Sequence, residues 1–424
     1  MRYMSVEEIK EKFLNFFKKN DHRFVNPSGI LPKGDPTLLF INSGMAPMKP
    51  YFLGASTAPY PKLTNIQDCI RTVDIDDVGD SYHGSSFRMM GSWSFGDYFK
   101  EKAIELAFTL ITEGFGFPAD RLYATVMKSD HSLPNVPDDE ESAKIWKKFL
   151  PSDHIIWCPP SDNFWGPAGE SGPCGPCTEV FYDRGPEYGD KNSKDQLVRE
   201  RHIEIWNAGV FMQYIKSSAG AISQLPMHCV DTGAGLERFA MLLQDAPSIH
   251  EIDQYKQVYD KIVGYTKNHK NSRIILDHAK TSLLMMSEGV SPGNQRHAYV
   301  LRRLLRRILT LHHLDNIELK NIIGIMEMLA KTMDNSSNII AAMPFIGSIM
   351  QSEVGSFERI IARAEKHFSK IIKERTILAS YAFELKTAHG IPTELIQEFC
   401  KKNNINFPEN QFSELLKKHR DISR

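Results

Sequence analysis

Two segments of the 424-residue chain carry side chains that could hold a nucleotide. The first runs from Arg71, through an acidic stretch, to His83 and Phe87. An arginine on one strand could neutralise an α-phosphate, and an aromatic ring on the return strand could stack on a base. Taken by itself, however, the segment is more typical of a plain hairpin whose aromatic residues pack.

The second segment is Asp231-Thr-Gly-Ala-Gly-Leu-Glu-Arg238, which lies where a strand pattern gives way to a helical one. Gly233 and Gly235 would let the backbone approach a ligand closely, and Arg238 would meet phosphate at the start of the helix. The run lacks the Gly-Lys-Ser/Thr ending of a Walker loop. By itself it is also typical of an ordinary strand-to-helix turn that Asp231 caps.

Cys174-Gly-Pro-Cys177 has the spacing of a redox motif or of half a zinc site. The sequence around it lacks the βαβ pattern of a thioredoxin-like protein. A zinc ion needs two further ligands, and His154 and Cys158 are the only candidates nearby. We therefore expect a structural loop here and no zinc.

A cationic stripe is predicted on one helix. Leu301, Leu304, Leu305 and Ile308 cluster on one side of the helical wheel, and four arginines fall on the other. These arginines are Arg302, Arg303, Arg306 and Arg307. The stripe is either a solvated face that pairs with acids or a surface for phosphate groups.

The composition excludes several classes of protein. The formal net charge is −1, so no bulk attraction to nucleic acid or membrane exists. The longest apolar run, of about a dozen residues, contains Pro344 and Gly347 and is too short to span a bilayer. Six cysteines do not make a disulfide scaffold, and the N-terminal stretch carries Glu7 and Glu8, where a signal or transit peptide would avoid acids. We expect a cytoplasmic protein without a membrane partner.

The elements that position these residues follow from periodicity. Ser5 and Glu8 form a capping-box pattern before a helix that continues to Phe17. The run Leu38 to Ile41 predicts a strand, and the run Glu101 to Glu113 predicts a helix. Residues 155–235 are rich in strands and loops, and the helical period dominates after residue 236. We expect an α+β domain over residues 1–240 and an all-helical domain over residues 241–424.

Taken together, the motifs resemble those of class II aminoacyl-tRNA synthetases. Arg71 with His83-x-x-x-Phe87 is similar to their motif 2, and Asp231 to Arg238 is similar to motif 3. Longer strings, in family order over about residues 6 to 310, resemble the alanyl-tRNA synthetase family. These strings are Asp35-Pro-Thr-Leu-Leu-Phe40, Ser43-Gly-Met45, Gly91 to Lys100, Ser161 to Trp165, Gly172 to Glu179, Glu204 to Asn207, Val230 to Gly233 and Tyr299 to Arg307.

The resemblance implies an antiparallel class II sheet flanked by helices, followed by a helical tRNA-recognition domain. It implies a ligase of protein biosynthesis that activates L-alanine with ATP and Mg²⁺ and transfers it from alanyl-adenylate to the 3′ end of tRNA(Ala). Catalysis would come from positioning and charge neutralisation. The alternative is a paralogue that activates an amino acid for a non-tRNA acceptor. We expect a monomer.

The resemblance also assigns roles to residues of this chain. Arg71 and Arg238 would be catalytic, with Arg71 on the α-phosphate and Arg238 opposite Phe87 across the adenine. The ATP-binding set would be Arg71, His83, Phe87, Met89, Gly235 and Arg238. The alanine-binding set would be Met45, Trp165, Asn207, Val210, Asp231 and Gly233, with Asp231 on the substrate ammonium group and Glu179 a carboxylate for Mg²⁺. The tRNA acceptor stem would meet Asn294, Arg302, Arg303, Arg306, Arg307 and Thr387.

Four departures from the family pattern carry expectations of their own. Arg88 replaces an acid beside the adenine, and one inserted residue between Trp206 and Val210 would shift the wall of the alanine pocket. The family reads a G:U pair with an asparagine and an aspartate, and Thr387 stands in the place of the aspartate. Because threonine accepts a hydrogen bond from guanine less strongly than an acid, we expect relaxed dependence on that pair. We also expect a minimal form without the editing and C-terminal domains.

Overall fold

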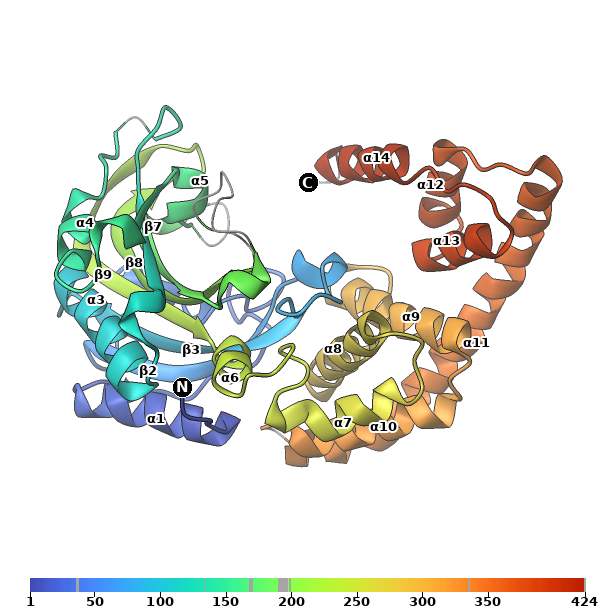
Figure 1. Cartoon of the computed structure of the whole chain (residues 1–424), viewed down its shortest axis with the longest axis horizontal. Coiled ribbons are helices and arrows are strands. Elements are labelled where there is room, and N and C mark those ends of the chain that lie inside the picture. Colours follow the sequence, from blue (N-terminus) through green and yellow to red (C-terminus); the bar gives the residue numbers. More distant parts are fainter. Residues whose placement is uncertain are drawn as a thin grey trace. The chain divides into compact units, whose positions relative to one another are not determined.

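The computed structural model describes residues 1–35, 38–133, 135–167, 171–189, 197, 200–334 and 336–422 (Figure 1). Pro36 and Thr37, which belong to one of the matched strings, lie outside the described residues. The chain divides into two compact units, Met1–Lys256 and Gln257–Arg424. The expected domain boundary after residue 240 stays a prediction. Within the described ranges, no helix has the length and apolar character needed to cross a membrane.

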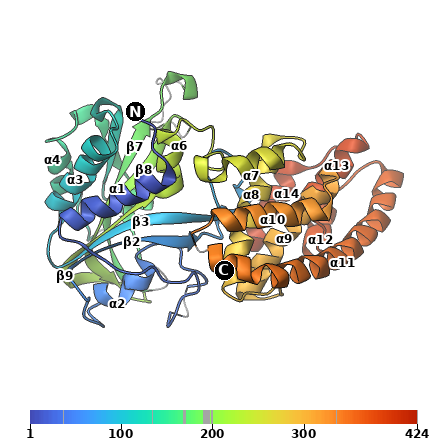
Figure 2. The same ribbon diagram turned by 90° about the horizontal axis from the view of Figure 1, so that it is seen from below.

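The first unit is built on a mainly antiparallel sheet, of which nine strands lie within the described residues (Figures 1 and 2). Along the sheet the order is β1 (Arg23–Phe24), β2 (Lys62–Ile70), β3 (Ser86–Phe95), β9 (Ile222–Gly235), β8 (His202–Lys216), β7 (Gly172–Asp183), β4 (Leu122–Met127) and β5 (Ile155–Cys158), and β6 (Phe164–Trp165) pairs with β7. Only the pairs β1–β2 and β4–β5 among these are parallel.

Helices cover one face of this sheet. They are α1 (Val6–Lys19), α3 (Lys100–Thr109) and α6 (Leu236–Leu243), which contact the central strands, and α4 (Glu140–Trp146), which packs on α3. On the other face lies α2 (Lys49–Phe52), whose Phe52 packs in the cluster that contains Trp93 (Figure 2). The short helix α5 (Pro160–Asn163) contacts β4 and β7. The ring of Trp206 in β8 lies 5.9 Å from that of Phe13 in α1 and 5.9 Å from that of Phe239 in α6. Both hydrogen bonds of the expected capping box form between Ser5 and Glu8, which confirms where α1 begins.

Two of the expected elements differ from the structure. The strand expected over Leu38 to Ile41 is wrong, because this stretch is irregular and Ile41 N donates to the carbonyl of Ile30 instead of to a strand ladder. The apolar run reflects burial of a loop. The helix expected from Glu101 to Glu113 forms as α3 and continues as a π-helical turn over Leu110–Gly114.

The second unit is helical in all its described elements, as expected. After α7 (Asp253–Val263), which contains the boundary between the units, come α8 (His269–Ser287), α9 (Arg296–Asp315), α10 (Leu319–Thr332), α11 (Ser336–Glu374), α12 (Ala379–Thr387), α13 (Thr393–Lys402) and α14 (Glu409–Ile422). The apolar side of α9 is buried, as the helical wheel predicts.

A buried ion pair joins β3 to α6. The Arg88 side chain is 6% exposed and that of Glu237 is 3% exposed. Arg88 Nε donates to Glu237 Oε1 at 3.0 Å, Arg88 N donates to Glu237 Oε2 at 3.0 Å, and the guanidinium also donates to Gln254. The cation that replaces an acid in the family pattern is therefore compensated inside the protein.

Replacing Arg88 by Ala would leave the Glu237 carboxylate buried without its cation. We expect the free energy of unfolding to fall by about 3–5 kcal/mol, measured by urea denaturation. Lys102→Ala is the control, since it breaks an exposed pair with Glu105 and should cost no more than about 1 kcal/mol. Equal small losses in the two variants would show that the Arg88–Glu237 pair does not hold β3 to α6.

Candidate active site

A cavity of about 630 Å³ opens in the first unit and collects side chains from distant parts of the chain. Arg71, from the end of β2, and Asp231, from β9, both line it. The other predicted residues on its wall are His83, Phe87, Met89, Trp165, Glu179, Asn207, Val210, Gly233, Gly235 and Arg238. Its volume is typical of a site for a small organic ligand.

Strand alternation explains why these residues share one wall. In β3, Phe87 and Met89 are two apart and point to the same side, and in β9 the same holds for Asp231, Gly233 and Gly235. β3 and β9 are paired in register, with Met89 opposite Gly235. A Cβ atom on Gly233 would lie 2.8 Å from the sulfur of Met89, so only glycine fits there without displacing that side chain.

The arginine expected to meet the α-phosphate lies directly after β2. Arg71 Nε donates to the carbonyl of Asn42 at 3.2 Å, and its guanidinium carbon lies 4.8 Å from the centre of the Phe87 ring. The two groups predicted to hold phosphate and base are thus in contact. A base that stacks on this face of Phe87 must displace the guanidinium.

Arg238, in the first turn of α6, is held by Glu204, which is not among the predicted site residues. Its Nη1 donates to Glu204 Oε2 at 2.8 Å and to the carbonyl of Glu204 at 3.1 Å. Glu204 lies in β8 and lines the cavity. Nothing in the local sequence of either residue predicts this pair, because 34 positions separate them.

A β-bulge places two predicted residues on the cavity wall. Asn207 and Val210 are three apart, so a regular strand would turn them to opposite faces. The pairing with β9 shifts between them, with Asn207 opposite Gly233 and Val210 opposite Asp231. The extra residue is absorbed, and both side chains face the cavity.

Asp231 is almost fully buried, with 7% of its surface exposed. Burial raises the pKa of its carboxyl group to about 7, and a hydrogen bond from Trp93 acts in the opposite direction. Trp93 Nε1 donates to Asp231 Oδ1 at 2.8 Å. Trp93 is not among the predicted site residues, although its even spacing from Phe87 in a strand predicts that both point to the same side.

Glu179 offers oxygen ligands at the same wall. Burial, and next the nearby carboxylate of Glu204, raise the pKa of Glu179 well above its ordinary value. Asn207 Nδ2 donates to Glu179 Oε1 at 3.5 Å. A buried carboxylate beside a second acid suits a divalent cation. In the part of the chain that the structure describes, three or more His, Cys, Asp or Glu side chains nowhere form a metal-binding group.

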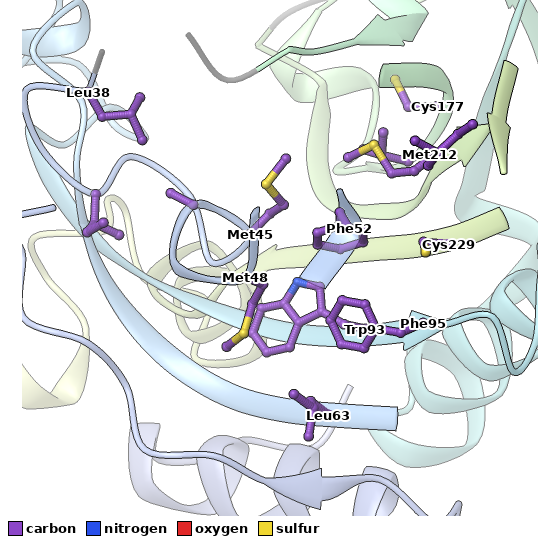
Figure 3. Close-up of a cluster of buried hydrophobic side chains, with 14 of the residues drawn as sticks. Leu38, Met45, Met48, Phe52, Leu63, Trp93, Phe95, Cys177, Met212 and Cys229 are labelled. Carbon is purple, nitrogen blue, oxygen red and sulfur yellow. The ribbon is translucent and has the colours of Figure 1, made fainter. Parts of the chain in front are cut away.

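Of the two remaining predicted residues, His83 lies at the cavity wall and Met45 does not. His83 Nδ1 lies 2.5 Å from Asp80 Oδ2, which orients the imidazole at the cavity wall. Met45, predicted to contact alanine, is fully buried instead in the apolar cluster beneath the cavity, beside Trp93 (Figure 3). The structure does not bring Met45 to the wall.

The two cysteines of the Cys-x-x-Cys run lie in different apolar clusters. Cys174 packs with Met127 and Tyr214, whereas Cys177 belongs to the cluster that contains Trp93. Both thiols are free, and burial raises the pKa of Cys174 to about 11. A reactive cysteine has a lowered pKa, so the structure favours a structural role. The expected loop is wrong, however, because both cysteines lie in strand β7, where their side chains are buried.

The predicted tRNA-binding residues lie on helices α9 and α12 of the second unit, except Asn294, which lies just before α9. Arg302 and Arg306 of α9 approach Glu353 of α11 at 3.3 and 4.0 Å, and Arg307 Nε donates to Glu394 of α13 at 3.0 Å. These arginines therefore bind α9 to its neighbours. Arg303 lies beside them on α9, and Thr387 is the last residue of α12. Asn294 Oδ1 accepts a hydrogen bond from Arg302.

Comparison with known proteins gives a consistent result. Residues 8–424 match the family model described as tRNA synthetases class II (A). The alanine–tRNA ligase of Thermobifida fusca is 37% identical over 99% of this chain and 49% of its own length, and that of Rubrobacter xylanophilus is 35% identical over 100% and 50%. The chain spans about half the length of the curated relatives it matches.

Among solved structures, apo histidyl-tRNA synthetase of S. aureus is similar with a TM-score of 0.34 and 11% identity, over 58% of this chain and 68% of that one. The α+β fold, with its helix-flanked antiparallel sheet and helical second unit, agrees with the family match. The chain belongs to the class II (A) tRNA synthetase family.

Proposed function

We propose that this chain activates L-alanine with ATP and transfers it to the 3′ end of tRNA(Ala). The observation that carries the proposal is the placement of Arg71 and Asp231 on one cavity wall with the adenine-binding candidates Phe87 and Arg238. A cation for phosphate and an anion for an ammonium group are the two charges that an amino acid and ATP require.

The substrates would occupy the cavity by charge and size. The Asp231 carboxylate would pair with the alanine ammonium group, while Trp165 and Val210 would line the space for its methyl side chain. The alanine carboxylate would attack the α-phosphorus in line, and pyrophosphate would leave. Arg71 would neutralise the negative charge that develops on the α-phosphate oxygens, so no protein nucleophile is needed.

Glu179 would hold Mg²⁺ in this scheme. The donor set fits the ion, because carboxylate oxygen is its preferred ligand and the raised pKa of Glu179 reflects a buried charge that a cation would relieve. Mg²⁺ neutralises phosphate charge when it is bound. Glu237, held by Arg88, presents a further acid at the cavity wall close to the adenine candidates.

Replacing Arg71 by Ala removes the cation at the reacting phosphate. We expect alanine-dependent exchange of pyrophosphate into ATP to slow by about 10²–10³-fold. Arg23→Ala is the control, since Arg23 is exposed and packs on Tyr60 away from the cavity. Unchanged exchange in Arg71→Ala would refute its role. Exchange by the unmodified chain without charging of tRNA would favour a non-tRNA acceptor.

Two side chains of the second unit are suited to read a base-pair edge. Thr387 Oγ1 donates its proton to the Phe383 carbonyl at 2.8 Å, so its lone pairs are left to accept. Asn294 Oδ1 accepts from Arg302, so its amide nitrogen is left to donate. Arg302 links Asn294 to Glu353, and Glu353 also approaches Arg306. The guanidinium of Arg306 lies close to Gly390, three residues after Thr387.

A weak acceptor at residue 387 predicts weak selection of the acceptor-stem pair. We expect tRNA(Ala) transcripts with G:U or G:C at that pair to be charged with kcat/KM values within about tenfold of each other. Thr387→Asp should widen the preference for G:U, and Thr387→Val should slow charging of both transcripts. A much slower reaction with G:C in the unmodified chain would contradict this.

A further inference from the structure

The indole of Trp93 sits in a slot that two glycines leave open. A Cβ on Gly91 would lie 2.5 Å from Trp93 Cζ2, and a Cβ on Gly44 would lie 2.9 Å from the same atom. Real Cβ atoms do not approach so closely, so any other residue at either position would displace the ring. The chain therefore reserves space for a bicyclic side chain in the buried cluster beneath the cavity.

The indole ring is fully buried, and its one polar atom, Nε1, donates a hydrogen bond to Asp231. Trp93 is 0% exposed, with Met45 and Met48 beside it in the cluster of Figure 3. A buried indole N–H costs free energy unless it finds an acceptor. Trp93 lies opposite Asp231 in the β3–β9 pairing, and its Nε1 donates to Asp231 Oδ1 at 2.8 Å.

We propose that Trp93 is a positioning residue, whose N–H holds one carboxylate oxygen of Asp231 so that the carboxylate presents a fixed, anionic edge to the substrate ammonium group. This inference rests on the proposed function, since it needs an amine-bearing substrate in the cavity. Phenylalanine would fill much of the slot but would supply no donor.

The electrostatic consequence follows from the geometry. Burial raises the pKa of Asp231, and the bond from Trp93 is the opposing influence that keeps it near 7. Without that donor the carboxyl group would be protonated to a higher pH, and a neutral acid does not pair with ammonium. The other titratable or charged side chains on the cavity wall are Arg71, Asp74, His83, Glu179, Glu204, Glu237 and Arg238.

Trp93→Phe tests the inference in the full chain, with alanine-dependent pyrophosphate exchange followed from about pH 6 to pH 9. We expect the alanine KM at pH 7 to rise about tenfold, with a smaller effect on kcat. The pH below which KM rises should move upward by about one unit. Because other cavity groups also titrate, the shift between the two proteins is the result that counts.

Trp206→Phe is the matched control. Trp206 is equally buried, but it packs against α1 and α6, and its Nε1 has no hydrogen-bond partner within the described residues. Its substitution should lower the thermal stability and leave the pH dependence of the alanine KM in place. Equal pH profiles for Trp93→Phe and the unmodified chain would overturn the proposal. Absence of alanine-dependent exchange in the unmodified chain would instead overturn the proposed function.

A second measurement needs neither a substrate nor a folded Trp93 variant. The five tryptophans give indole N–H signals in a ¹H–¹⁵N spectrum of the ¹⁵N-labelled chain. We expect one signal to move with pH around a midpoint near 7 and to stay fixed in Asp231→Asn. If all indole signals behave alike in the two proteins, Trp93 does not sense the charge of Asp231 and the inference is wrong.

Discussion

The alternation of side chains along three neighbouring strands is the constraint on which the rest of the first unit depends. On β3, β9 and β8, one set of alternate residues faces α1 and α6, where Trp206 packs with Phe13 and Phe239. The other set faces the cavity. A sheet with one face covered by helices leaves its second face free for a ligand, and the register of the strands then determines which side chains meet there.

Charge is distributed unevenly over this second face. Arg71 and Arg238 share the wall with several carboxylates, and Arg238 is already paired with Glu204. Asp231 lies deeper, where its only described hydrogen bond from a side chain comes from Trp93. Arg238 therefore has an anionic partner in the protein, whereas the Asp231 carboxylate has no cationic partner among the described residues. An unpaired carboxylate on the same wall as two arginines is the arrangement that the proposed zwitterionic substrate requires.

Much of this arrangement could be predicted from the sequence, since short-range rules govern it. Capping at Ser5, the change from strand to helix after Gly235 and the buried side of α9 all depend on neighbours within one or two turns. The cavity residues were found through resemblance to a family, which carries long-range information that periodicity lacks.

The remaining features depend on contacts between distant residues. Leu38 to Ile41 is apolar because a loop is buried, and no local pattern separates such a loop from a strand. Arg88 and Glu237 are 149 positions apart, so only the pairing of β3 with its neighbours explains why a reversed charge is tolerated. Met45 was expected at the cavity wall, but it packs in the same buried cluster as Trp93. The size of that cluster depends on distant residues, so the local sequence does not reveal it.

The bulge in β8 also has a consequence for how this strand accommodates an added residue. Side chains alternate between the two faces of a strand, so adding or removing one residue moves every following side chain to the opposite face. The bulge between Asn207 and Val210 takes up an extra residue, and both side chains stay on the cavity face. The pairing with β9 shifts a second time between Met212 and Tyr214, so β8 has two places where an added residue is taken up locally and the side chains beyond it keep their faces.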